Sequence, residues 1–257
     1  MPGYYRIKYA NGQHSDGITD PAGQWDQYRL PQRVDGLKVY DYGTWDGGLA
    51  IEAARRGAAE VWGLDAFVWE MWSDTRSNFE RNVAMSGVAV MDAYVETEPV
   101  PKRRWNATSR ANPHKLSIEE FATKRGPADV VIAAGVFYHL RNPLLFLENL
   151  TFLLKPTSRL HLTTFCLPEQ PEPIMRFSPG WRGDDTNYWL ASVSCVTEMA
   201  ASVGLHVLET HQVDAAIPEA PLFLFVAQPE SRTSLAVAPP ASPTAARSAS
   251  PSEPRQV

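Results

Sequence analysis

The sequence is poor in the features that mark secreted, metal-binding or membrane proteins. Its 257 residues include two cysteines, Cys166 and Cys195, which lie far apart in the chain, so neither a disulfide framework nor a structural zinc site is expected. The longest apolar runs have the length of strands and fall well short of the roughly 20 residues that a membrane helix requires. No secretory signal is recognisable at the start. We therefore expect a reducing, cytoplasmic setting and no membrane partner.

An excess of positive charge is also missing. The 24 Lys and Arg residues face 29 Asp and Glu residues, which gives a net charge of −5. Because an acidic chain is not drawn to phosphate backbones, DNA is not expected as a partner. The six histidines show no metal-ligand spacing with acids or cysteines, so no metal site is expected. What remains is 44% apolar residues, enough for one globular domain with appendages.

Composition divides the chain into an N-terminal segment, a central domain and a tail, at residues 1–35, 36–228 and 229–257. The first segment contains a hairpin signal at Asn11-Gly12 and is interpreted as a lid. The tail has no aromatic residue and is rich in Pro, Ala and Ser, which predicts disorder. Inside the central domain, we interpret residues 96–116 as an inserted loop and residues 167–190 as a loop that contacts the acceptor of the reaction.

In the central domain, short β-rich runs alternate with helical stretches, which is typical of a parallel sheet covered by helices. Expected strands lie at residues 37–42, 60–65, 88–95, 129–136, 159–165, 205–213 and 222–228. Expected helices lie at residues 49–56, 69–85, 143–154 and 192–203, with a short one that begins at a capping box at Ser117. The short connection between the last two strands predicts that they pair antiparallel. We predict an α/β fold of three layers, α/β/α, with a seven-stranded, mostly parallel sheet that ends in an antiparallel hairpin.

The turn after the first strand carries the strongest functional signal. It reads Asp41-Tyr42-Gly43-Thr44-Trp45-Asp46-Gly47-Gly48, an acid and a glycine-rich turn that opens a helix, as in nucleotide-binding sites. Trp45 stands where a dinucleotide fold needs glycine to admit pyrophosphate, which disfavours NAD and FAD and favours S-adenosylmethionine. Asp65 ends the second strand, where an acid can accept both ribose hydroxyls. Alternatively, the glycines merely form a tight turn and Asp46 caps the helix.

Three motifs carry a family resemblance: residues 41–47, Arg55-Arg56-Gly57-Ala58, and the stretch from Gly135 to Pro143, GVFYHLRNP. Over residues 36–228 the chain resembles the class I S-adenosylmethionine-dependent methyltransferases, in the branch related to the tRNA wobble-uridine carboxymethyltransferase. The resemblance implies the Rossmann-like methyltransferase fold with S-adenosylmethionine as cofactor. In carboxymethyl-transferring relatives, the tyrosine that matches Tyr138 helps to recognise the additional carboxylate. Their upstream lysine and downstream arginine do not align here, so ordinary methyl transfer is favoured.

The expected cofactor contacts follow the first, second and fourth strands: Asp41, Gly43, Thr44, Trp45, Asp46, Gly47, Asp65, Ala66, Gly135 and Tyr138. Asp92 and Glu96 are alternatives for a contact to adenine. Ligands of such sheets bind beyond the carboxyl ends of the strands, where His139 is our candidate base for deprotonating an acceptor hydroxyl. The alternative for His139 is a structural role in the pocket wall.

Aromatic and polar residues suited to gripping a sugar or a ring form the expected substrate site: Tyr138, Trp181, Asn187, Trp189 and, from the hairpin, His14. The alternatives are a loop whose tryptophans cover the sheet edge and a simple exposed hairpin. We predict an enzyme that methylates a hydroxyl of a small molecule, a sugar or natural product. An RNA-base methyl- or carboxymethyltransferase that uses Lys102-Arg103-Arg104 ranks below it, and a non-catalytic cofactor-binding scaffold ranks third. The sequence does not fix the acceptor or the oligomeric state.

Overall fold

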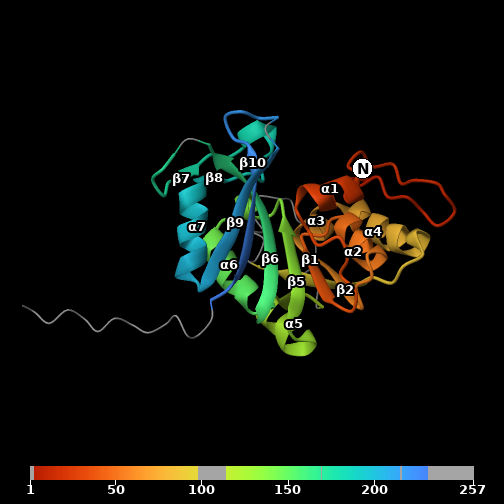
Figure 1. Cartoon of the computed structure of the whole chain (residues 1–257). Helices are drawn as coiled ribbons and strands as arrows, with labels where there is room; N and C mark the ends of the chain where they lie inside the picture. Colours follow the sequence, from red (N-terminus) through yellow and green to blue (C-terminus); the bar gives the residue numbers. More distant parts are fainter. Residues whose placement is uncertain (1–2, 98–113, 169, 215, 231–257) are drawn as a thin grey trace, which may run out of the picture.

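A ten-stranded sheet organises the molecule (Figure 1). The computed structural model describes residues 3–97, 114–168, 170–214 and 216–230. The strands are β1 (Lys38–Tyr42), β2 (Glu60–Asp65), β3 (Met91–Glu96), β4 (Leu116–Ser117), β5 (Ala128–Ala134), β6 (Leu154–Leu167), β7 (Met175–Phe177), β8 (Trp189–Ser192), β9 (Leu205–Asp214) and β10 (Leu222–Pro229). Most of the predicted inserted loop, its basic run Lys102-Arg103-Arg104, and nearly all of the predicted tail lie outside the described residues.

The main path through the sheet has the order β4-β3-β2-β1-β5-β6-β10-β9. Strands β3, β2, β1, β5 and β6 pair in parallel, and β10 pairs antiparallel with both β6 and β9. These seven strands are the predicted ones, and the terminal hairpin is confirmed. Three short strands were not predicted: β4 at one edge, and β7 and β8 beside the end of β6. Strands β2 and β3 follow β1 on one side of it, whereas β5 and β6 are added on its other side. Sheets of this kind bind ligands at the point where the strand order reverses, here between β1 and β5.

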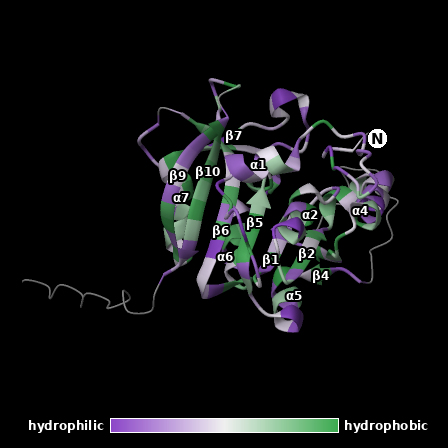
Figure 2. Cartoon of the chain, turned by 45° about the vertical axis from the view of Figure 1, so that its right-hand side comes forward, coloured by the Kyte–Doolittle hydropathy of each residue, from purple (hydrophilic) through white to green (hydrophobic). Residues whose placement is uncertain are grey.

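Helices cover both faces of the sheet: α1 (Pro21–Gln27), α2 (Gly48–Arg55), α3 (Phe67–Met71), α4 (Ser73–Ser86), α5 (Ile118–Arg125), α6 (Pro143–Thr151) and α7 (Val193–Ser202). Alternate strand residues face opposite layers. In β1, Tyr40 packs in the core shared with α5, α6 and α7, whereas Val39 packs in the core shared with α1 and α2. Figure 2 shows the apolar residues concentrated along central strands such as β5. The predicted three-layer fold is therefore confirmed.

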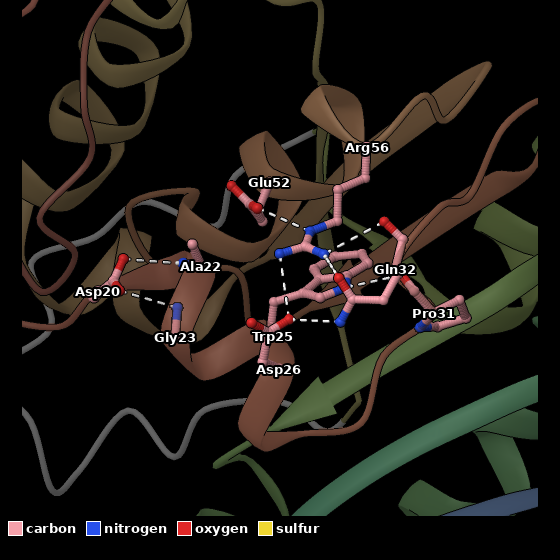
Figure 3. A network of polar contacts seen from close by, with 9 residues as sticks. All are labelled: Asp20, Ala22, Gly23, Trp25, Asp26, Pro31, Gln32, Glu52 and Arg56. Carbon is pink, nitrogen blue, oxygen red and sulfur yellow. Dashed lines mark hydrogen bonds and ion pairs between the residues drawn. The ribbon is translucent and has the colours of Figure 1, made fainter.

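The N-terminal segment is partly a hairpin and partly a layer of the core. Lys8 and His14 form an antiparallel bridge around the predicted turn. Helix α1, which we had not predicted, inserts the fully buried Trp25 beneath α2. The Arg56 guanidinium lies 5.1 Å from the Trp25 ring centre and bonds to Glu52 and Gln32, which locks α1 to α2 (Figure 3). The segment therefore supports the fold as well as carrying the exposed hairpin.

Two predicted elements differ from the structure by more than a shift of a few residues at their ends. The helix expected at residues 69–85 is two helices, α3 and α4, separated at Trp72, whose backbone is extended (φ −128°, ψ 105°). At this break, Trp72 lines the cavity that is described in the next subsection. The strand expected at residues 159–165 is the longer β6. Within the described part of the chain, no helix is long and apolar enough to cross a membrane.

Candidate active site

A cavity lies at the carboxyl ends of the central strands. One side of the cavity is formed at the ends of β1 and β2, where Gly43, Trp45, Asp65 and Ala66 line it. Glu96 and Thr97 after β3 line a second side. The third side consists of the segment after β5, with Gly135, Val136 and His139, and the loop between β7 and β8, with Asp184, Thr186 and Tyr188. The cavity thus spans the switch point between β1 and β5 and connects the predicted cofactor turn to His139.

The turn after β1 is shaped by backbone conformations that most residues avoid. Gly43 has φ +78°, and a Cβ there would lie 2.4 Å from Cγ2 of Val136. Trp45 has φ +55°, a left-handed conformation that is unusual for a bulky residue. It is held because its N–H donates to Asp65 Oδ2 (3.2 Å) and its carbonyl accepts from the Trp69 indole (2.8 Å). The turn therefore presents an indole to the cavity where a dinucleotide fold presents bare backbone.

Two of the three carboxylates expected at the cofactor do not line the cavity. Asp41 accepts hydrogen bonds from the Thr44 hydroxyl (2.7 Å) and the Ala50 N–H (3.1 Å). Asp46 accepts from the N–H groups of Tyr4 (2.8 Å) and Tyr5 (3.2 Å). Burial raises the pKa of each carboxyl to about 6. Neither residue is among those that line the cavity, so Asp41 braces the turn with Thr44 and Asp46 anchors the N-terminal segment. Gly47, the residue before α2, has a left-handed backbone (φ +92°) and is also not among the cavity-lining residues.

Asp65 is the carboxylate that faces the cavity. One oxygen accepts from Trp45 N–H, and the other accepts from Val68 N–H at 3.2 Å. Burial raises the pKa of this carboxyl to about 7, against the backbone N–H groups that stabilise its charged form. Each oxygen keeps a lone pair for a further donor, so the site fits a ligand that offers paired hydroxyls, such as the ribose of S-adenosylmethionine. Ala66 lies beside it in the cavity wall.

At the end of β3, the structure distinguishes the two alternatives for the adenine contact. Glu96 lines the cavity, whereas Asp92 lies outside it and pairs with Arg76. Lys115 bridges Glu96 (2.7 Å) and Glu70 (3.2 Å), and the two carboxylates raise the pKa of this lysine against the effect of burial. Glu96 is therefore held in the cavity lining by an ion pair with Lys115.

His139 lies in a 3-10 turn, Phe137–His139, directly after β5. Its Nδ1 lies 2.9 Å from the hydroxyl and 3.2 Å from the carbonyl oxygen of Thr186. The Thr186 hydroxyl in turn donates to Asp184 (2.6 Å). Burial lowers the pKa of His139, and the nearby Asp184 partly opposes this. A neutral imidazole that borders the cavity has the properties of a general base.

None of the predicted substrate residues is among those that line the cavity, but two of them belong to a chain of aromatic contacts that ends at His139. Tyr138 stacks on His139 with ring centres 4.2 Å apart, Phe165 packs on Tyr138 at 4.9 Å, and Trp181 packs on Phe165 at 5.0 Å. These aromatic rings therefore support His139 from behind. The Tyr138 hydroxyl is directed toward Gly135, since a Cβ at Gly135 would lie 3.4 Å from it.

The remaining substrate candidates lie further away. The Asn187 side chain donates to the Trp181 carbonyl (2.7 Å), which holds the loop, and Trp189 packs on Phe177 at 5.1 Å. His14 is exposed on the hairpin. Several cavity residues were missed from the sequence, among them Phe67, Trp72, Asp184, Thr186 and Tyr188. The loop between β7 and β8 was singled out from its aromatic residues, but Trp181 does not line the cavity, whereas Asp184, Thr186 and Tyr188 do.

Within the described residues, no group of three or more His, Cys, Asp or Glu side chains could hold a metal ion. The chain has the fold of solved methyltransferases. A methyltransferase from Aquifex aeolicus, described as S-adenosylmethionine-dependent, is 19% identical, with a TM-score of 0.51, 81% of this chain covered and 88% of that one. The N-terminal domain of EvdMO1, obtained with S-adenosylhomocysteine and D-fucose, is 16% identical with a TM-score of 0.56, and 88% and 90% are covered.

The 1,6-didemethyltoxoflavin-N1-methyltransferase of Burkholderia thailandensis, solved with its named substrate and S-adenosylhomocysteine, is 13% identical with a TM-score of 0.54, and 82% and 76% are covered. None of the curated proteins matches the chain. The model of a family described as "Methyltransferase domain" matches residues 22–210, which is most of the chain. With Asp65 and the turn after β1 at the switch point, the chain belongs to the methyltransferase domain family and is an S-adenosylmethionine-dependent methyltransferase.

Proposed function

We propose that this methyltransferase acts on a hydroxyl group of a small molecule, with His139 as the general base. The observation that carries the proposal is that Asp65 and His139 line one continuous cavity. A cofactor whose ribose binds Asp65 and an acceptor beside His139 would therefore share the same enclosure. Holding two reactants in line in this way can supply most of the acceleration of a displacement reaction.

The residues around the cavity fit this reaction. S-adenosylmethionine, when bound, would supply a methyl group on a sulfonium centre, and the electron pair of the broken S–C bond would stay on the sulfur of S-adenosylhomocysteine. The acceptor oxygen forms the new bond to carbon, and its proton passes to Nε2 of His139, because Nδ1 is directed at Thr186. The walls at Trp45, Trp72 and Leu140 are mostly apolar, which limits the access of water to the reacting atoms.

Relatives of low identity support a small acceptor. One contains 1,6-didemethyltoxoflavin and another was obtained with D-fucose, and both are small ring compounds. The family model and the structures named above give no support for the tRNA wobble-uridine branch. The basic run on which RNA binding would depend lies outside the described residues. We therefore keep a small-molecule acceptor as the proposal, and ordinary methyl rather than carboxymethyl transfer.

The test measures formation of S-adenosylhomocysteine from S-adenosylmethionine with a panel of sugars and phenols, in the wild type and in His139→Gln. We expect kcat to fall about 100-fold or more in the variant, the range for loss of a general base, with unchanged affinity for S-adenosylmethionine. His14→Gln, on the exposed hairpin, is the matched control and should retain activity. Full activity of His139→Gln would rule out the proposed base. Cofactor binding without turnover of any acceptor would support the scaffold alternative.

A further inference from the structure

We propose that Asp184 is a positioning residue: acting through the Thr186 hydroxyl, it fixes His139 in the tautomer that carries its proton on Nδ1. Only in that tautomer is Nε2 free to accept a proton from an acceptor hydroxyl. The inference rests on the proposed function in taking His139 as the base. The tautomer itself is a property of the protein alone, so it can be measured without cofactor or acceptor.

The single hydrogen of the Thr186 hydroxyl fixes the direction of its hydrogen bonds. A threonine hydroxyl has one proton to donate, and Thr186 donates it to Asp184 Oδ1 over 2.6 Å. The same hydroxyl oxygen lies 2.9 Å from His139 Nδ1, and because its proton is already used, it must accept there. The Thr186 carbonyl oxygen, 3.2 Å from Nδ1, is also an acceptor. Two acceptors therefore face Nδ1, which assigns the imidazole proton to this nitrogen.

Asp184 is held for this task by the loop between β7 and β8. Its Oδ1 also accepts the Thr186 N–H at 2.8 Å, and its own N–H donates to the Trp181 carbonyl at 3.3 Å. The loop is tied to the segment after β5 because Tyr188 N–H donates to the Tyr138 carbonyl at 3.0 Å. Thr186 is buried, while Asp184 is exposed at the cavity mouth. When this loop packs against the segment after β5, it therefore places both the hydroxyl and the carbonyl oxygen of Thr186 next to Nδ1 of His139.

Removal of Asp184 would release the Thr186 proton. The hydroxyl would then be able to donate to Nδ1, which would favour the tautomer with the proton on Nε2 and leave no base for the acceptor. Removal of the Thr186 hydroxyl as well should restore the original tautomer, since the carbonyl oxygen of Thr186 remains as the sole partner of Nδ1. This predicted rescue separates an effect through the hydroxyl from a general loosening of the loop.

His161 offers an internal control in the same chain. It is buried, and its Nδ1 faces the carbonyl oxygen of Tyr28 at 3.1 Å with no hydroxyl relay described between them. Burial lowers the pKa of His161 to about 4, so it too is neutral near pH 7.5. Its backbone acceptor assigns the proton to Nδ1 and is untouched by changes in the loop. Its tautomer should therefore be the same in every variant.

The experiment is nitrogen-15 NMR of the histidine rings in the full chain without cofactor at pH 7.5, with signals assigned through His139→Gln and His161→Gln. We expect the Nδ1–H pattern for His139 in the wild type and Asp184→Asn, whose side-chain oxygen can still accept from Thr186. We expect a shift toward Nε2–H in Asp184→Ala and a return to Nδ1–H in Asp184→Ala/Thr186→Val. An Nε2–H pattern in the wild type, or no change in Asp184→Ala, would overturn the proposal.

Kinetics provide a second readout once an acceptor is known. Asp184→Ala should lower kcat about 10-fold to 100-fold, and the double variant should recover part of that loss. Asp184 and Tyr138 lie next to His139, and Tyr188 and Arg141 line the same cavity. The pH profile of kcat is therefore compared between the wild type and Asp184→Ala, in which the other three groups are intact. A fall in kcat without a change of tautomer would mean that Asp184 acts on the acceptor instead, and would refute the relay. The NMR result does not depend on whether His139→Gln loses activity. The proposed tautomer of His139 and its proposed role as general base can therefore be refuted independently of each other.

Discussion

The two sides of the cavity are built in different ways. On the cofactor side, residues close in sequence hold one another: Asp41 accepts from Thr44 and Ala50, and Asp65 accepts from Val68. On the acceptor side, the contacts join distant segments, such as His139 with Thr186 and Tyr138 with Tyr188. The cofactor side is therefore largely a local structure at two strand ends, whereas the acceptor side exists only when the loop between β7 and β8 has docked.

This difference suggests how one fold serves many acceptors. A site made of local contacts survives changes elsewhere, so the cofactor can stay the same while the loop varies. Two residues of the cofactor side are exceptions. Asp46 accepts from the distant Tyr4 and Tyr5. The Trp45 indole packs 5.5 Å from that of Trp72, and the Trp45 N–H donates to Asp65. Through this residue the turn also contributes to the shape of the cavity.

The largest expected effect is on the cofactor side. Asp65→Ala removes a carboxylate positioned for two charge-assisted hydrogen bonds, and we expect a loss of about 3 kcal/mol, roughly 100-fold in affinity for S-adenosylmethionine. Calorimetric titration measures it, and thermal unfolding checks that the variant is folded. Asp92→Ala, which removes a carboxylate outside the cavity, should bind normally. Equal affinities of Asp65→Ala and the wild type would refute the assignment of the ribose site.

A smaller effect is expected where the two sides meet. Gly43→Ala places a Cβ in a left-handed position and within 2.4 Å of Val136, so we expect a loss of about 2–3 kcal/mol in the free energy of unfolding. Gly126→Ala is the matched control, because Gly126 has φ +72° and open space around it, and it should lose about 1 kcal/mol. Urea unfolding measures both. Adding Val136→Ala to Gly43→Ala should restore the free energy of unfolding that Gly43→Ala loses in excess of Gly126→Ala. If it does not, the clash of the new Cβ with Val136 is not the cause of that excess loss.

The smallest effect is a pH dependence confined to the cofactor side. Because the pKa of Asp65 is raised to about 7 and its ionised form accepts the ribose hydroxyls, affinity should rise as pH rises, by roughly tenfold from pH 6 to pH 8. Binding at pH 6 should release a proton from this carboxyl. Calorimetry in buffers of different ionisation enthalpy measures that release. Asp65→Asn is the control, since ionisable groups of the cofactor contribute equally in both proteins, and the same release in Asp65→Asn would contradict the prediction.

Much of the fold could be predicted from the alternation of β-rich and helical stretches and from the capping and turn residues that bound them. The limits of β2 were predicted to the residue, and the capping box at Ser117 begins α5 as expected. Helix α1 was missed because its stability comes from Trp25, buried against α2, rather than from an amphipathic pattern of its own. The break at Trp72 was missed for a similar reason, since residues 69–85 keep helical spacing on both sides of it.

The sequence by itself determined the parallel sheet, the turn after β1 and the acid at the end of β2, because these depend on local propensity and on short spacings along the chain. It also placed His139 after β5. Only the tertiary structure decided which carboxylate faces the cavity, since Asp41, Asp46 and Asp65 differ in the partners that reach them and not in residue type. It likewise decided that Thr186 and Asp184, rather than Trp181 and Trp189, meet His139, because that contact joins segments 47 residues apart and forms only when the loop packs on the sheet.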